Sequence, residues 1–388
     1  MRLRLAVLAA AALLGAQPAS AQDPPEDPRI AQVRAHLDLL DDTAIRPPCD
    51  QQPEPERWQS AAPPDSGSRD PVISAHRGAL TLAPENTLWS YEYAFAYGVD
   101  LVEVDIQQTA DGRFVALHDA TVDRTTDGSG AVNTLTYDEV RALNAADYEP
   151  WKGGEFDPAQ VASVEEVLAL AARVGGGLEL DIKGSVTEEG ELAELVAEYG
   201  LIEESIFNSA DIRIFVVDPA ANLIYNRNTF EPPFLIYEIG QVLSVFGSRL
   251  DEYSPESIVA AHDACAIVMP HAYDAGPEQE VAQFELARSI GADGVQTNQP
   301  NDIVAAAGLP VDTRLRAHER HKRVTVCLVN ADNRLGLPTK PIDVRKGHRA
   351  VTVIAGKAGC VKLPDGNWNG ANARFAGDGS ANPASTRI

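Results

Sequence analysis

Short apolar runs alternate with segments of helical periodicity between residues 71 and 309. The runs that predict strands are Val72–Ala75, Leu101–Ile106, Phe114–Leu117, Leu178–Ile182, Ile212–Val217, Ile267–Met269 and Gly294–Gln296. The segments that predict helices are Thr87–Tyr97, Tyr137–Leu143, Val164–Arg173, Glu188–Tyr199, Pro255–Ala261 and Glu278–Ile290. Strands alternating with helices over this length predict a parallel α/β fold, and one (β/α)8 TIM barrel fits it. An open doubly wound sheet is the alternative, but no G-x-G-x-x-G turn follows the first strand, which disfavours a dinucleotide-binding domain.

The chain begins with the pattern of a signal peptide at residues 1–21. Arg2 and Arg4 precede the apolar run Leu5–Leu14, and Ala19-Ser20-Ala21 forms a small-residue cleavage site. We therefore expect a secreted or periplasmic protein after removal of the leader. Neither this run nor any later one is long and apolar enough to predict a transmembrane segment.

Two further regions flank the α/β domain, which we place at residues 71–310. Residues 22–70 form an extension rich in Pro, Asp and Gln, with one amphipathic stretch at Ile30–Leu40 and a linker at 47–68. After Pro310 the chain has short β-type runs and turns but no clear helix. Residues 311–388 are therefore predicted to form a small C-terminal β-sandwich-like domain that ends in a loose tail.

The chain is strongly acidic, with 32 Lys and Arg against 57 Asp and Glu and a formal net charge of −25. Removal of the leader takes away two arginines and leaves 30 against 57, a net charge of −27. Such a surface argues against nucleic acid and anionic membranes as partners. It is compatible with divalent cations.

The four cysteines, Cys49, Cys265, Cys327 and Cys360, have no zinc-site spacing. In an oxidising compartment an even number predicts two disulfides. We expect a Cys327–Cys360 bond because both residues lie in the strand-rich C-terminal segment, which leaves Cys49 with Cys265. Free buried thiols are the alternative.

Two carboxylates alternate along the apolar run Leu101–Ile106. If this run is a strand, Glu103 and Asp105 project to one face. Two carboxylates inside an apolar strand are unfavourable unless a positive charge lies between them, and oxygen-rich pairs are the ligands of Mg²⁺ and Ca²⁺. A salt-bridged pair on a half-exposed strand is the alternative.

The segment "LELDIKG" repeats this pattern, with Glu179, Asp181 and Lys183 on one face. A buried ion pair would also explain it. His76, followed by Arg77, and His118 each stand at the tip of a predicted strand. A lone histidine at such a place is more often structural, but two beside a metal site can act as general acid and general base.

The order of these motifs resembles the glycerophosphodiester phosphodiesterase family. The resemblance covers residues 71–309 and rests on His76-Arg77-Gly78, Pro84-Glu85-Asn86-Thr87, Glu103-x-Asp105, Asp111-Gly112, His118-Asp119, Arg124-Thr125-Thr126, Asp181-Ile182-Lys183 and the run "GADGVQTNQP". It implies a (β/α)8 barrel, a divalent cation (Ca²⁺ or Mg²⁺) and two catalytic histidines.

Position by position, the resemblance assigns acid and base roles to His76 and His118, without saying which is which. It makes Glu103 and Asp105 metal ligands, and Arg77 and Lys183 the cations on the phosphate side. The third ligand of the family is usually a glutamate where this chain has Asp181, so Glu179 is a possible substitute. Aspartate here is similar to the sphingomyelinase D-type phospholipases. Asn298 stands where an aspartate is common, at a position we do not interpret as catalytic.

The sequence thus predicts metal-dependent hydrolysis of a small-molecule phosphodiester, a glycerophosphodiester, to glycerol 3-phosphate and an alcohol. One alternative is a sphingomyelinase D-type phospholipase acting on membrane lipids. Another is a non-catalytic protein that binds its partner on a barrel scaffold. The role of residues 311–388 is left open.

Overall fold

The computed structural model describes residues 70–209, 214, 221–227, 242–245, 255–263, 267–273, 276–320 and 323–388. The predicted signal peptide and all of the extension except Asp70 lie outside the described residues, as do Cys49 and Cys265. Within the described residues, no helix has both the length and the apolar character needed to cross a membrane.

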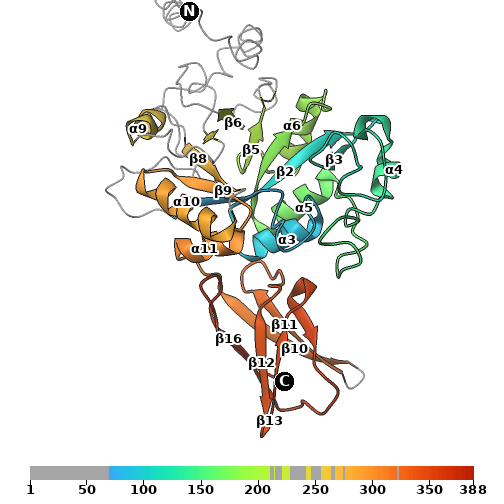
Figure 1. The fold of residues 1–388 in the computed structure, drawn as a ribbon, viewed down its shortest axis with the longest axis vertical. Coiled ribbons are helices and arrows are strands. Elements are labelled where there is room, and N and C mark those ends of the chain that lie inside the picture. Colours follow the sequence, from blue (N-terminus) through green and yellow to red (C-terminus); the bar gives the residue numbers. More distant parts are fainter. Residues whose placement is uncertain are drawn as a thin grey trace, which may run out of the picture.

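The first part of the chain is built around a parallel sheet that curls on itself (Figure 1). Its described strands are β1 (Val72–Ala75), β2 (Leu101–Gln108), β4 (Gly177–Ile182), β5 (Ser205–Asn208), β6 (Asn222–Arg227), β7 (Val242–Val245), β8 (Ile267–Ala272) and β9 (Gly294–Thr297). They neighbour one another in the order β1-β9-β8-β7-β6-β5-β4-β2, and β1 also pairs with β2. This confirms the prediction of a parallel α/β fold. A complete (β/α)8 barrel also requires helices after β5 and β6, and those connections lie almost entirely outside the described residues.

Helices cover the outside of the curled sheet. They are α3 (Leu88–Ala96), α5 (Val164–Val174), α6 (Glu189–Glu198), α9 (Pro255–Asp263), α10 (Pro277–Ser289) and α11 (Pro300–Ala307). The short helices η4 (Val132–Thr134) and α4 (Tyr137–Arg141) lie in the excursion between β3 and α5. Helix α5 shows why such segments become helical: Ser163 caps its start in a capping box, and Val164, Val167, Leu168 and Ala171 form one buried stripe.

The structure differs from the sequence predictions for this part in the direction of one strand and in three strands that were not predicted. The run Phe114–Leu117 forms β3 (Phe114–Ala116), which pairs antiparallel to β2 because the link at 109–113 is too short for a parallel crossover. The predicted strand at 212–217 lies outside the described residues except for Ile214, which is helical. Strands β5, β6 and β7 were not predicted at all.

Residues 311–388 form two antiparallel sheets, as expected for a β-rich region. One contains β10 (Thr313–Arg320), β11 (Arg323–Asn330) and β14 (Cys360–Lys362); the other contains β13 (Arg349–Ile354), β12 (Pro341–Lys346), β15 (Asn372–Phe375) and β16 (Ala384–Arg387). Leu315 and Leu328 of the first sheet and Val344 and Phe375 of the second belong to one buried core. The tail is therefore not loose, because β15 and β16 complete the second sheet.

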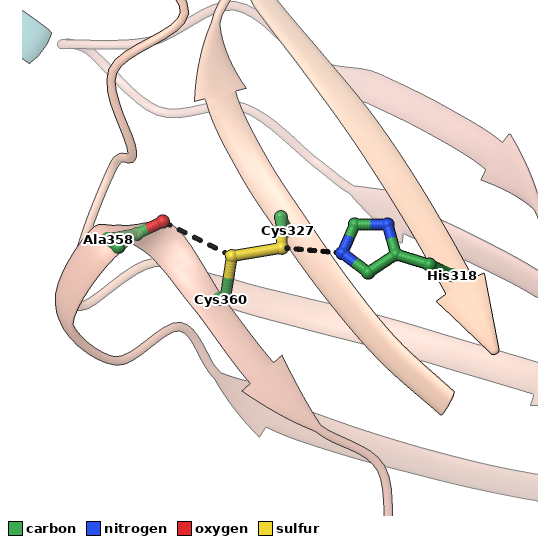
Figure 2. Close-up of a disulfide and its surroundings, with 4 residues drawn as sticks. All are labelled: His318, Cys327, Ala358 and Cys360. Atoms are coloured by element: carbon green, nitrogen blue, oxygen red, sulfur yellow. Dashed lines mark hydrogen bonds between the residues drawn. A yellow bond between two sulfur atoms is a disulfide. The ribbon is translucent and has the colours of Figure 1, made fainter. Parts of the chain in front are cut away.

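The predicted disulfide between Cys327 and Cys360 is present and joins β11 to β14 (Figure 2). The two cysteines face each other across the ladder, with Cα atoms 4.0 Å apart. The Nε2 atom of His318 lies 3.7 Å from the Cys327 sulfur.

We expect this bond to stabilise the C-terminal region measurably. It closes a loop with a sequence separation of 33 residues, for which chain entropy gives about 3–4 kcal/mol. The free energy of unfolding should fall by this amount in the Cys327→Ser/Cys360→Ser variant, measured by denaturant titration with tryptophan fluorescence. An unchanged free energy of unfolding in this double variant would contradict the prediction.

The C-terminal region contacts the curled sheet at the end of α3. The side-chain amides of Asn330 and Asn333 donate to the carbonyl oxygens of Ala96 (3.1 Å) and Phe95 (2.8 Å). The Tyr97 hydroxyl donates to the carbonyl of Pro338 at 3.1 Å. These contacts precede β2, so the C-terminal region lies at the amino-terminal ends of the parallel strands.

Candidate active site

Three carboxylates gather at the carboxyl ends of β2 and β4. The parallel register places Glu103 opposite Glu179 and Asp105 opposite Asp181. Ligand oxygens of Glu103, Asp105 and Asp181 all lie within 4.8 Å of one another. These are the three residues that the sequence nominates as metal ligands.

Asp105 is the most strongly held of the three. Its side chain is fully buried, and its Oδ1 lies 2.6 Å from the Lys183 ammonium while its Oδ2 lies 3.4 Å from the Arg77 Nε. Asn86 donates its side-chain amide to Oδ2 at 2.6 Å. Burial alone would raise the pKa of Asp105, but Lys183 and then Arg77 outweigh it and bring the pKa to about 2. Asp105 is therefore ionised at any working pH.

The pKa of Glu103 is shifted in the opposite direction to that of Asp105. It accepts a hydrogen bond from the backbone N–H of Arg77 at 2.6 Å. Burial, followed by the negative charges of Asp105 and Asp181, raises the pKa of Glu103 well above its usual value. A third carboxylate in this position is unfavourable without further positive charge.

The residues present fit a divalent cation. Three carboxylates supply hard oxygen ligands, the kind that Mg²⁺ and Ca²⁺ bind. The buried Oδ1 of Asp105 accepts no hydrogen bond of good geometry and is faced by the Lys183 ammonium. Lys183 also lies 2.5 Å from Asp181, so it contacts two of the three candidate ligands.

Glu179, the alternative third ligand, is engaged elsewhere. Its Oε2 accepts from the Ser74 hydroxyl at 2.6 Å, and its Oε1 accepts from the Gln296 amide at 2.8 Å. It is not a member of the carboxylate cluster. The geometry therefore favours Asp181 as the third ligand.

Glu179 should make the stability of the metal-free protein depend on pH. Burial raises its pKa to about 7, so its ionisation opposes folding. The stability present below its ordinary pKa is lost as the pH rises towards 7, by about 3 kcal/mol in total. In denaturant titrations in chelator at about pH 5 and pH 8, the loss of stability should be smaller by this amount in Glu179→Gln than in the natural chain, because Glu103, whose pKa is also raised, contributes equally to both. The exposed Glu198→Gln should behave as the natural chain does; an equal pH dependence in Glu179→Gln would contradict the assignment.

His76 lies directly after β1 and is held on two sides. Its Nδ1 lies 2.7 Å from the side-chain oxygen of Asn298, which follows β9. Its ring stacks on Tyr273, with centroids 4.2 Å apart and planes 3° from parallel. The Tyr273 hydroxyl in turn lies 2.8 Å from Nδ1 of His271. Burial, followed by the charge of His76, lowers the pKa of His271 to about 3, so His271 is neutral.

The sequence analysis missed His271 and Tyr273 and gave Asn298 no role. His271 and Tyr273 alternate at the end of β8. This is the same two-residue period that singles out Glu103 and Asp105, and it could have identified them. The contact between Asn298 and His76 joins residues that are 222 positions apart in the sequence, so no local pattern predicts it.

His118 follows β3 and belongs to a chain of charged groups. Its Nδ1 lies 2.7 Å from Asp119, which accepts from the Arg124 Nε at 2.7 Å. Arg124 also donates to Glu85 at 2.6 Å, and Glu85 accepts from Arg77 at 3.1 Å. The chain of contacts links His118 to the guanidinium next to His76. Glu85, in the Pro84–Thr87 segment, is the residue that joins the two guanidinium groups of this chain of contacts.

The loop after β1 has an unusual backbone. Arg77 (φ 53°) and Asn86 (φ 54°) adopt the left-handed region, which non-glycine residues seldom do except where surrounding contacts hold them. Asn86 is held by Asp105 and by the Tyr91 hydroxyl at 2.7 Å. Gly78 has φ 77°, and a Cβ there would lie within 2.8 Å of Ser90. The loop thus directs the Arg77 side chain towards the carboxylates.

Known proteins resemble this chain in sequence. The family described as "Glycerophosphoryl diester phosphodiesterase family" matches residues 76–217. A glycerophosphodiester phosphodiesterase from Caldanaerobacter subterraneus is 31% identical over 254 residues, which cover 60% of this chain and 96% of that protein. The Bacillus subtilis protein YhdW is 35% identical over 144 residues, 36% of this chain. The chain spans 58% of the length of YhdW.

Solved structures show the same fold. A glycerophosphodiester phosphodiesterase from Agrobacterium tumefaciens superposes with a TM-score of 0.52 and 23% identity, covering 61% of this chain and 99% of that one. A phosphodiesterase from Oleispira antarctica, solved with sn-glycerol-3-phosphate, gives a TM-score of 0.50 and 24% identity over 61% of this chain and 96% of that one.

The relatives that these comparisons name as glycerophosphodiester phosphodiesterases belong to the class of phosphoric diester hydrolases. Within this class, the chain belongs to the glycerophosphodiester phosphodiesterase family.

Proposed function

We propose that the chain hydrolyses glycerophosphodiesters to glycerol 3-phosphate and an alcohol, with the help of a divalent cation. The observation that carries this proposal is the carboxylate cluster at 103, 105 and 181, which lies beside the arginine and lysine that the family resemblance puts on the phosphate side. Family membership and the sn-glycerol-3-phosphate bound to the Oleispira phosphodiesterase support the substrate class.

In this proposal Glu103, Asp105 and Asp181 hold Ca²⁺ or Mg²⁺. The bound cation would offset the negative charge of the phosphodiester and lower the pKa of a hydroxyl or water. Arg77 and Lys183 stabilise the charge that develops on the phosphoryl oxygens in the transition state. Both cations already lie against Asp105, so they are held in place before the substrate binds.

The two histidines move the protons. One removes a proton from the attacking oxygen, and the other protonates the departing alkoxide. Asn298 and Asp119 each contact Nδ1 of one ring and so fix the orientation of the two imidazoles. Asp119 also stabilises a positive charge on His118, whereas the neutral Asn298 offers His76 no such charge.

Release of glycerol 3-phosphate from a panel of glycerophosphodiesters tests the proposal. The assay is run with Ca²⁺, with Mg²⁺ and with chelator, and we expect cation-dependent release that ranks the head groups and the ions. Hydrolysis of sphingomyelin or lysophospholipid in vesicles, without release from the soluble panel, would instead favour a phospholipase of the sphingomyelinase D type, which Asp181 resembles. No hydrolysis of either would favour a binding protein.

We also propose that residues 71–310 form a complete (β/α)8 barrel, that residues 311–388 form a β-sandwich-like domain, and that the chain is exported. The circuit of parallel pairings supports the barrel, and the two packed sheets support the domain. The disulfide is typical of an oxidising compartment. Mass spectrometry of the exported protein should show a chain that begins at Gln22; an uncleaved chain in the cytoplasm would contradict export.

A further inference from the structure

The charge of the chain is divided very unevenly. Residues 311–388 carry 14 Lys and Arg against 6 Asp and Glu, a formal net charge of +8, whereas residues 1–310 carry 18 against 51, a net charge of −33. The net charge of the whole chain conceals this division. The expectation that the protein avoids anionic membranes therefore holds for residues 1–310 and not for the C-terminal region.

The excess of basic over acidic residues is greatest at the end of the C-terminal region that lies away from the curled sheet. Strands β10 and β12 begin beside the curled sheet and run away from it, so the end of β10, the start of β11 and the β12–β13 turn lie away from that sheet (Figure 1). We call the described basic residues at this end the distal cations: Arg323, Arg345, Lys346, Arg349, Lys362 and Arg387. The register supports the grouping, because Lys362 pairs with Thr325 near Arg323, and Asn372 pairs with both Arg345 and Arg387.

No ion pair joins a distal cation to a carboxylate of the described residues. Among the described residues of the C-terminal region, the ion pair is that of Lys340 with Asp378 at 2.7 Å, near the curled sheet. Lys346 donates to Asn367, and Arg349 donates to the carbonyl of Asp365 and lies over the Trp368 ring at 4.1 Å. Glu319 and Asp365 are acidic residues described at this end, and Asp343 lies two residues before Arg345 on β12. The positive charge there is left for an external partner.

We propose that the distal cations dock the protein on the surface of a bilayer containing anionic phospholipids. Both sheets contribute cations on the side of the region away from the curled sheet, and these cations are exposed or partly exposed. An anionic surface attracts this end and repels the acidic remainder, so it also orients the molecule. A nucleic acid is the other polyanion that a basic patch can bind, and it is an outcome of the test below.

This orientation has a consequence for the substrate, which rests on the proposed function. The C-terminal region is attached at the amino-terminal ends of the parallel strands, while the carboxylates and histidines lie at their carboxyl ends. Docking by the distal cations turns the catalytic edge away from the bilayer. The protein then acts on soluble phosphodiesters near the membrane and not on the lipids of the membrane to which it is bound.

Co-sedimentation of the full mature chain with vesicles tests the docking without any turnover. We expect binding to vesicles of phosphatidylglycerol and phosphatidylcholine in equal parts, no binding to phosphatidylcholine alone, and release on raising NaCl from about 0.1 M to about 1 M. Absence of binding to the anionic vesicles, equal binding to both kinds, or binding to duplex DNA with none to vesicles would overturn the proposal. Failure of the hydrolase assay would leave this result unaffected.

Paired variants locate the surface. Arg323→Gln/Arg345→Gln removes one distal cation from each sheet and should lower the partition coefficient about 30-fold, since each basic side chain near the surface is worth about five-fold. Arg314→Gln/Arg334→Gln removes the same charge near the curled sheet and should change it less than about three-fold. Unchanged melting temperatures would show that both variants fold. Equal losses in the two variants would overturn docking by the distal end.

Discussion

Replacing His76 or His118 by alanine is expected to lower kcat for glycerophosphodiester hydrolysis by about 10²–10⁴-fold. Each imidazole stands at a strand end with its Nδ1 held at 2.7 Å, by Asn298 or by Asp119, so each is positioned to transfer a proton. Alanine removes the proton carrier and leaves the carboxylate cluster unchanged. The measurement is kcat at saturating cation.

A substrate with a good leaving group assigns the two roles. A p-nitrophenyl phosphodiester needs no protonation of the departing oxygen, so the variant that lacks the general acid should recover much of its rate on this substrate. The variant that lacks the general base should not. His348→Ala, which changes an exposed histidine of the β12–β13 turn, serves as the control and should retain normal turnover. Near-normal turnover by either catalytic variant would sink the two-histidine mechanism.

Asp105→Asn and Asp181→Asn are expected to raise the cation concentration for half-maximal activity by more than about 100-fold. Each change removes one of three clustered carboxylates while keeping the shape of the side chain. Asp105→Asn should also destabilise the fold, because Lys183 and Arg77 lose a buried counter-charge, and breaking such a pair costs about 3–5 kcal/mol. Activity titrated with Ca²⁺ and Mg²⁺ gives the first effect, and denaturant titration gives the second.

Glu179→Gln is the matched control for the carboxylates. It changes a buried acid on the same strand as Asp181 that bonds to Ser74 and Gln296 and lies outside the cluster. Its cation requirement should stay within about three-fold of the natural value. Equal effects of Glu179→Gln and Asp181→Asn, or turnover that persists in chelator, would contradict the ligand set.

Periodicity in the sequence, together with the family resemblance, was enough to find the carboxylate cluster. Glu103 and Asp105 alternate within an apolar strand, and Glu179 and Asp181 alternate within the next parallel strand, so two short patterns placed these carboxylates side by side, and the family resemblance singled out Asp181. The order of motifs predicted the family, which the comparisons show. The acid–base and ligand roles of these residues stay predictions until the variants are measured.

Other features depend on contacts between residues that are far apart in the sequence, or on the length of the link between two strands. Strand β6 begins and ends with polar residues, Asn222 and Arg227, so its pattern is not apolar enough to predict a buried strand. The antiparallel direction of β3 follows from the short link before it and not from its own composition. The contact of Asn298 with His76 exists because β1 and β9 are neighbours. Chain topology decides such contacts.

Helix α3 connects the two ends of the molecule. Its first turn follows Glu85 and Asn86, which contact Arg77 and Asp105, and its last carbonyl groups are capped by side chains of the C-terminal region. A helix whose terminal carbonyls lose their partners frays from that end. The appended sheets are therefore coupled through α3 to the loop that organises the carboxylates, although more than two hundred positions separate the two in the sequence.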